Sequence, residues 1–245
     1  MAWDIRRGKW TEPELAVIPW ALKPGEAAVD VGANFGLWTY HLCRAVEPDG
    51  HVFAFEPIPW TYSTLRKVAW LLRFRNAELY RLGCSDREGV AEFATPTQES
   101  GAVAAGLAYL RDARGNWGKE NDLAHPAMWT KVVAIDDVVP IGAPVALIKC
   151  DIEGAELFAL QGAAGLISRC VPTVVCEMAP GLLGRYGVAV DDVMEFFYDK
   201  GYSMYHYESP RRGRLRRVTS TIGIEWMNFV FLHESREERF AGVLE

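Results

Sequence analysis

Short apolar runs alternate along this chain with stretches in which apolar side chains recur every three or four positions. A short run bounded by turn residues is typical of a buried strand, whereas the longer spacing predicts a helix with one apolar face. Along 60–74, for example, Leu65, Val68 and Leu72 share one face. The runs predict strands at 26–31, 51–56, 77–82, 145–151, 172–177, 202–207 and 227–233. The recurring spacing predicts helices at 37–46, 60–74, 155–167 and 190–200.

This order of elements predicts a single α/β domain over residues 1–245. Strands that alternate with helices form a mostly parallel sheet with helices on both faces. The last two strands, 202–207 and 227–233, have no helix between them, so we expect an antiparallel pair at the end of the sheet. Residues 1–25 form an N-terminal extension. Residues 94–131 interrupt the pattern, and we expect them to form an insertion or a lid.

The composition is that of an ordinary globular protein. Hydrophobic residues make up 50% of the chain and charged residues 24%, and the net charge is -6, which argues against non-specific nucleic-acid binding. The first residues lack the apolar core of a signal peptide, and no apolar run approaches the ~20 residues of a membrane span. The cysteines form no CxxC pair, so we expect reduced thiols and a cytoplasmic location. They are Cys43, Cys84, Cys150, Cys170 and Cys176.

The first strand runs into a glycine-rich turn, "AVDVGANFGLWTYHL" at 28–42. In open α/β sheets ligands bind at the carboxyl ends of the strands, where this turn lies. We expect Gly32 and Gly36 to let the backbone approach a ligand. The pattern is D-x-G-x-N-x-G, with Asp30 and Asn34, and it lacks the second glycine of the dinucleotide fingerprint. Asp30 would repel a pyrophosphate and favour an ammonium or sulfonium group.

The second predicted strand ends in Glu56. An ionised carboxylate there can accept hydrogen bonds from both hydroxyls of a ribose. The helix that follows the glycine turn presents free N–H groups to a carboxylate. Together with Asp30, these features predict a ligand that has a ribose, a positive centre and a carboxylate, and S-adenosylmethionine has all three.

Four blocks of the chain resemble the FkbM-type S-adenosylmethionine-dependent methyltransferases. The blocks are "VDVGANFGLWT" at 29–39, "FAFEPIPWTYSTL" at 53–65, "ALIKCDIEGAELFALQGA" at 146–163 and "PTVVCEM" at 172–178. The resemblance implies a class I methyltransferase fold, a Rossmann-like sheet of seven strands with the last one antiparallel. It also implies O-methylation of a hydroxyl on a sugar, a glycosylated metabolite or a polyketide-type acceptor.

Candidate catalytic residues follow the strands 145–151 and 172–177. Asp151, Glu153 and Glu177 are carboxylates that can serve as general base, because an alcohol attacks well only as its proton leaves. Lys149 lies in an apolar strand, so we expect it to reach Asp151 or Glu177. In the resembling fold, Asp151 also faces the transferred methyl group of the cofactor. Glu156 is interpreted as a helix cap, and His206 is an alternative base.

Two further features concern ligands other than the methyl acceptor. Carboxylates at strand ends can hold Mg²⁺, but the chain lacks adjacent aspartates after the fifth strand, so a metal is left open and not favoured. In the resembling fold, the loop 83–89 covers the adenine, and Ser85 and Asp86 are candidates to bind the ring.

The segment RRGRLRR at 211–217 favours an anionic acceptor, such as a phosphorylated sugar or a lipid headgroup. Its arginines are Arg211, Arg212, Arg214, Arg216 and Arg217. No stacking aromatic residues accompany them, so RNA is a weaker interpretation. The tryptophans outside the predicted strands have faces that stack on sugars; they are Trp3, Trp10, Trp20, Trp117 and Trp129.

Several alternatives stay open on the sequence. They are N-methylation, a lipid-linked or phosphorylated acceptor, an NAD(P)-dependent oxidoreductase and a non-catalytic binding module. The sequence also leaves open whether the chain forms a homo-oligomer.

Overall fold

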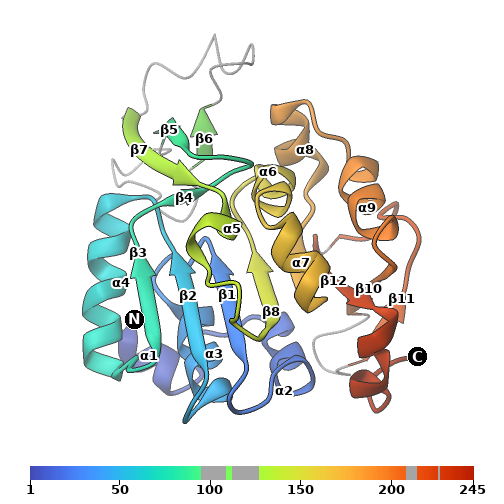
Figure 1. Ribbon diagram of the computed structural model, residues 1–245, viewed down its shortest axis with the longest axis horizontal. Helices are drawn as coiled ribbons and strands as arrows, with labels where there is room; N and C mark the ends of the chain where they lie inside the picture. The colour runs from blue at the N-terminus through green and yellow to red at the C-terminus, as the bar shows by residue number, and fades with distance from the viewer. Residues whose placement is uncertain (95–108, 112–126, 208–213, 226) are drawn as a thin grey trace.

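A computed structural model describes residues 1–94, 109–111, 127–207, 214–225 and 227–245 of the chain. Within these residues, the central sheet has eight strands in the order β11-β10-β12-β9-β8-β1-β2-β3 (Figure 1). Five neighbouring strands are parallel: β9 (Thr173–Glu177), β8 (Val145–Cys150), β1 (Ala27–Val31), β2 (His51–Phe55) and β3 (Ala77–Tyr80). The predicted α/β class and mostly parallel sheet are therefore confirmed.

The other end of the sheet is antiparallel. Strand β12 (Asn228–His233) lies between β9 and β10 (Tyr202–Tyr207) and is antiparallel to both. The expected antiparallel pair is thus present. The expected number of seven strands is wrong, because β11 (Leu215–Arg217) adds an edge strand beyond β10. Its three residues carry two exposed arginines, so no apolar run marked it as a strand.

Helices cover both faces of the sheet. One layer consists of α2 (Ile18–Ala21), α3 (Leu37–Val46) and α4 (Pro59–Leu72). The opposite layer consists of α5 (Ile135–Val138), α6 (Glu156–Gln161), α7 (Ala164–Cys170) and α9 (Val190–Tyr198). The alternation of strand side chains divides the core accordingly, because Val29 packs with Leu160 on one face and Ala28 packs with Leu42 on the other.

The expected single helix over 155–167 is divided into α6 and α7. Gly162 lies at this break, and a Cβ there would be 2.0 Å from the backbone oxygen of Ser85, so the chain touches the loop that carries Ser85 at this point. The short helices α8 (Pro180–Leu183) and η4 (Gly184–Tyr186) follow β9, and η5 (Glu234–Phe240) follows β12.

A second, four-stranded sheet lies beyond the carboxyl end of β3 (Figure 1). Its order is β4-β7-β5-β6, with β4 (Gly83–Cys84), β5 (Gly89–Ala94), β6 (Tyr109–Arg111) and β7 (Ala127–Val133). The described part of the expected insertion, 94–131, therefore consists of strands, and its remainder lies outside the described residues. Phe93 of β5 packs against Ile58, which follows β2 of the central sheet.

The N-terminal extension packs on the helical layer of α3 and α4. Helix α1 (Ala2–Arg6) inserts Ile5 against Leu37 and Val68, and η1 (Pro13–Val17) leads into α2. This path brings residues 10–12 to the carboxyl ends of the strands. In the part of the chain that the structure describes, no helix is both long and apolar enough to span a bilayer.

Candidate active site

A cavity of about 220 Å³ lies at the carboxyl ends of β1, β2, β8 and β9. Parallel strands end at the same edge, and the register pairs Asp30 with Lys149 and Lys149 with Val175. The sequence-predicted residues that line the cavity are Gly32, Asn34, Glu56, Lys149, Asp151, Glu153 and Glu177. The predicted residues that do not line it are Asp30, Gly36, Ser85, Asp86 and His206. The structure thus brings the four candidate catalytic residues together with three of the candidate cofactor residues.

The two glycines of the first turn allow neighbouring parts of the chain to pack closely against the turn. Gly32 has a φ of +81°, and a Cβ there would lie 2.0 Å from the backbone oxygen of Asp151. Gly36 has a φ of +90°, and its Cβ would lie 2.7 Å from Leu65. Gly32 therefore lets the ends of β1 and β8 meet, and Gly36 lets α3 begin beside α4. Both glycines therefore have a packing role; Gly32 also lines the cavity, where its approach to a ligand stays a prediction, whereas Gly36 does not line it.

Glu56 follows β2 and is 5% exposed. One carboxylate oxygen accepts a hydrogen bond from the backbone N–H of Asn34 at 3.0 Å, and the other accepts one from Ile58 at 2.9 Å. Burial raises the pKa of this carboxyl to about 7, against the effect of the two N–H donors. Each oxygen keeps further acceptor capacity, so Glu56 can receive hydrogen bonds from two hydroxyls in the cavity.

Asp30 lies beneath the cavity floor and is 1% exposed. The hydroxyl of Thr39 donates to its Oδ2 at 2.6 Å. Burial raises the pKa of Asp30 to about 6, although Thr39 and the ammonium of Lys149 both favour the charged form. Asp30 does not line the cavity, whereas Lys149, whose positive charge acts on it, does.

Lys149 forms an ion pair with Asp151, with 2.8 Å between Nζ and Oδ2. Of the two partners expected for Lys149, Asp151 is the one that it contacts. The ammonium also lies 5.4 Å from the centre of the Trp38 ring. Burial disfavours the charge of Lys149, but the Asp151 carboxylate outweighs it and raises the pKa of the lysine. Lys149 is therefore a permanent positive charge that fixes the position of Asp151.

Glu153 and Glu177 face the same cavity as Asp151. Burial, followed by the charge of Asp151, raises the pKa of Glu153 to about 7. The pKa of Glu177 is raised by burial and by the carboxylates of Asp151, Glu156 and Glu153. Within the described residues, the buried Oε2 of Glu177 has no hydrogen-bond partner. Glu177 is thus a cavity-lining carboxylate with a raised pKa, and one of its oxygens is buried without a hydrogen-bond partner.

Glu156 holds the loop between β8 and α6 in place. Its Oε1 accepts hydrogen bonds from the backbone N–H groups of Ile152 at 2.9 Å and Gly154 at 3.1 Å. The side chain is 1% exposed. Both donors precede α6, whose N-cap Ala155 has no side-chain cap, so Glu156 holds the loop before the helix and the expected role as a helix cap is corrected to this one. It also fixes Glu153, whose φ of 61° is unusual for a residue other than glycine.

Replacing Glu156 with glutamine is expected to change how stability depends on pH. Burial raises the pKa of folded Glu156 from 4.5 to about 7. Its contribution to stability is therefore full below pH 4.5 and is lost as the pH rises through about 7, because the unfolded chain releases the proton first. Glutamine keeps the Oε1 acceptor and does not titrate. Relative to wild type, Glu156→Gln should gain free energy of unfolding across this range, measured by urea unfolding at several pH values.

The exposed variant Glu238→Gln is the control, since it changes charge at a site without these contacts. Equal pH slopes for wild type and Glu156→Gln would contradict the buried-carboxyl argument.

A model of the "Methyltransferase FkbM domain" matches residues 30–204, from the end of β1 to β10. The chain belongs to the FkbM methyltransferase family. The matched region includes the turn after β1, Glu56 and the loop that Glu156 holds. The sequence-based resemblance to this family is confirmed.

One known protein is similar to this FkbM-family chain in sequence, and one solved structure is similar to it in fold. "Methyltransferase 1" of Beauveria bassiana is 29% identical over 146 residues, which are 55% of this chain and 57% of that protein. The crystal structure of methyltransferase FkbM from Methylobacillus flagellatus KT superposes with a TM-score of 0.52 at 17% identity, covering 91% of this chain and 50% of that one. The chain therefore spans about half the length of these relatives, and the structural likeness supports the fold.

The FkbM match does not include the N-terminal wall of the cavity. Trp10 and Glu12 line the cavity from residues that precede the matched region. The indole N–H of Trp38 donates to Glu12 Oε2 at 2.6 Å and so ties this segment to α3. Phe35 lies 6.3 Å from the Trp10 ring, and Phe93 enters from the second sheet. Only Trp10 had a sequence signal, as a tryptophan outside the predicted strands.

A small apolar cavity of about 20 Å³ adjoins the main one in this FkbM-family chain. It shares Gly32, Pro57, Phe93 and Ile152 with the main cavity. Its other residues include Val31, Phe55, Leu82, Gly83, Cys84 and Ala155. Ser85 and Asp86 hydrogen-bond to each other at 3.1 Å just beyond it and line neither cavity.

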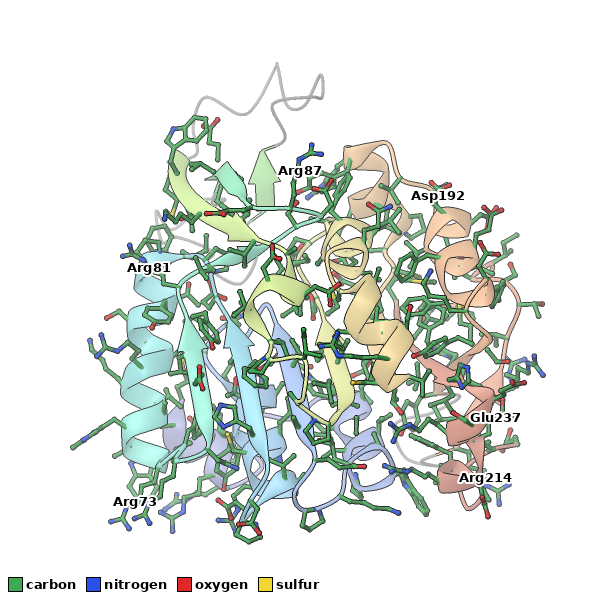
Figure 2. The ribbon with its side chains drawn as sticks, viewed as in Figure 1. Arg73, Arg81, Arg87, Asp192, Arg214 and Glu237 are labelled. Carbon is green, nitrogen blue, oxygen red and sulfur yellow. The ribbon has the colours of Figure 1, made fainter. Side chains whose placement is uncertain are left out.

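The remaining candidates lie apart from the cavity. Arg211 and Arg212 fall outside the described residues, and Arg214 pairs with Glu245 at 3.7 Å. Figure 2 places Arg214 near Glu237, at the opposite end of the molecule from the tips of β1 and β8. His206 packs against Phe229 in the sheet. Arg216 and Arg217 belong to the edge strand β11.

Metal ligation was left open by the sequence. Among the described residues, no group of three or more histidine, cysteine, aspartate or glutamate side chains has the geometry of a metal site.

Proposed function

We propose that the protein is an S-adenosylmethionine-dependent O-methyltransferase that acts on a hydroxyl of a small acceptor. The observation that carries this proposal is the pair of carboxylates at the cavity, Glu56 and Glu177, each with unused acceptor capacity. Glu56 can accept hydrogen bonds from the two hydroxyls of a ribose, and Glu177 can accept the proton of the acceptor hydroxyl. Membership of the FkbM family supports methyl transfer over the nicotinamide-dependent alternative.

The residues present fit S-adenosylmethionine. In this proposal Glu56 binds the ribose hydroxyls, and the adenine lies beside them against the apolar part of the main cavity at Pro57, Ile58 and Phe93. The buried Oδ1 of Asn34 has no partner within the described residues and can accept from the ammonium. The first turn of α3 offers N–H groups to the carboxylate. Bound in this way, the cofactor supplies a methyl group activated by its positively charged sulfur.

The chain's own contribution to the reaction is positioning and proton transfer. Glu177 accepts the proton of the acceptor hydroxyl at Oε2, which makes the oxygen nucleophilic as it attacks. Lys149 fixes the position of Asp151 through their ion pair, and the carboxylates that line the cavity favour the positive charge of the cofactor. Trp10 and Phe35 exclude water and present aromatic surface to the acceptor.

The charge of the cavity favours an uncharged acceptor, such as a sugar or a glycosylated metabolite. The ionisable lining residues are five carboxylates and one lysine: Glu12, Glu56, Asp151, Glu153, Glu177 and Lys149. Such a wall repels phosphate groups, and the described arginines of the 211–217 segment do not line it. This disfavours the phosphorylated-acceptor alternative. An amine is a second candidate, because the acidic wall attracts it and Glu177 can take its proton.

Titration with S-adenosylhomocysteine tests the cofactor assignment. Isothermal titration of the wild type should show micromolar binding, with NADH as a negative control. Glu56→Gln should weaken the affinity by about 10–100-fold, because hydrogen bonds to a charged acceptor are lost. The exposed Glu238→Gln variant should bind like the wild type. Binding of NADH instead of S-adenosylhomocysteine would refute the proposal.

Transfer of labelled methyl from S-adenosylmethionine then tests the acceptor class. Neutral sugars, amino sugars and sugar phosphates of matched size should be compared in one assay. We expect product from neutral sugars and none from the phosphates, whereas product from amino sugars alone would identify an N-methyltransferase.

A further inference from the structure

A second and larger cavity, of about 580 Å³, lies at the other end of the molecule. It is formed by the end of α1, the last turns of α3 and the residues that follow α4. In Figure 1 the lower ends of α1, α3 and α4 lie near one another, and Figure 2 shows Arg73 there, opposite the carboxyl ends of the strands. This volume falls within the range of roughly 300–1,000 Å³ that is typical of small-molecule sites.

The wall of this cavity is strongly basic, although the whole chain has a net charge of -6. Four arginines line it, from three separate segments: Arg6, Arg44, Arg73 and Arg75. Glu47 is the one acidic residue among the lining residues, and it lies 3.7 Å from Arg44 with both side chains largely exposed. Glu47 therefore offsets one of the arginine charges and leaves the lining with an excess of positive charge. Among the described residues, no ion pair engages Arg6, Arg73 or Arg75.

Arg73 occupies a backbone position that favours glycine. It follows the last turn of α4 with φ 61° and ψ 56°, the left-handed conformation of a helix C-cap. An arginine there carries a conformational cost that glycine would avoid. The backbone conformation therefore does not favour this side chain, whereas its positive charge suits both the end of α4 and the cavity.

The remaining wall is apolar and aromatic. Tyr40 and Phe74 have ring centres 6.1 Å apart, and Leu71 is 46% exposed beside them. We infer that this cavity binds an organic phosphate. Its phosphate oxygens are held by the guanidinium groups of Arg6, Arg73 and Arg75, which suit such oxygens in geometry and charge. Its less polar part lies against Tyr40, Leu71 and Phe74.

Isothermal titration of the full chain tests this site with three probes: inorganic pyrophosphate, ADP and the short-chain lipid dihexanoyl phosphatidic acid. Arg73→Gly removes the guanidinium and suits the backbone, so the variant should fold at least as well as the wild type. We expect Arg73→Gly and Arg75→Gln each to weaken binding by about tenfold or more. Arg66→Gln is the matched control, since Arg66 is exposed on α4 and does not line the cavity.

The three probes also separate the sources of the phosphate. Tighter binding of ADP than of pyrophosphate indicates a nucleotide, and tighter binding of the lipid indicates a headgroup with its chains. The absence of binding by all three probes, or an equal loss in Arg66→Gln, would overturn the inference. Affinity for S-adenosylhomocysteine should stay unchanged in all three variants, so this result is independent of the proposed methyl transfer.

Discussion

Replacing Glu177 with glutamine is expected to lower kcat for methyl transfer by about 10²–10⁴-fold, the usual contribution of a general base. Glutamine keeps the size of the side chain and cannot accept the proton of the acceptor. Because the proposed cofactor contacts lie on Glu56 and Asn34, affinity for S-adenosylhomocysteine should stay nearly constant. Steady-state kinetics and calorimetry on the same preparation measure both quantities.

The pH profile gives this prediction a second readout. A base works only when ionised, and the pKa of Glu177 is raised by burial and by the neighbouring carboxylates. The activity of the wild type should therefore fall as the pH drops below a value well above the 4.5 of an ordinary glutamate. This acid limb should disappear from the residual activity of Glu177→Gln.

Glu153→Gln is the comparison that separates the two neighbouring carboxylates. It removes a charge from the same cavity and leaves the free Oε2 of Glu177 in place. If Glu153→Gln loses the acid limb and Glu177→Gln retains it, the base is Glu153 and our assignment is wrong.

Substituting Gly32 with alanine should lower the free energy of unfolding by about 3–5 kcal/mol. Part of the cost is the positive φ of +81°, and the larger part is the Cβ at 2.0 Å from the backbone oxygen of Asp151. A backbone oxygen cannot rotate away as a side chain can, so the ends of β1 and β8 must separate. Urea unfolding measures the loss, and the same separation should weaken S-adenosylhomocysteine binding.

Gly8→Ala is the matched control for this clash. Gly8 also has a positive φ, of +65°, but nothing lies within 4 Å of the position that its Cβ would take. Its substitution should cost only about 1–2 kcal/mol, the backbone contribution alone. Equal losses of unfolding free energy at both positions would show that the close contact between β1 and β8 adds nothing to the cost of Gly32→Ala.

The sequence predicted most of the central sheet because its strands are buried on both faces. The run at 145–151 corresponds to β8 (Val145–Cys150), and the helix at 37–46 corresponds to α3 (Leu37–Val46). Buried strands appear as continuous apolar runs, and an amphipathic helix shows its period. Strand β11 has neither signal, because two of its three residues are exposed arginines.

The carboxylates of the candidate site were also predictable, since polar residues at the ends of apolar strands meet at one edge of a parallel sheet. The choice of Asp151 as the partner of Lys149 was not, because it depends on side-chain direction. The wall formed by Trp10 and Glu12 was not predictable either. It depends on how the N-terminal segment crosses α3, a contact between residues far apart in the chain.

The wall that the Trp38–Glu12 hydrogen bond holds in place comes from a different part of the chain than the floor of the cavity. The floor comes from strands whose register fixes the proposed cofactor contacts, whereas the wall comes from a segment that precedes the region matched by the family. Redesign of residues 10–12 thus offers a way to alter which acceptors enter without disturbing the sheet. For the same reason, substitutions in the N-terminal segment could change acceptor specificity during evolution while the strands of the sheet stay the same.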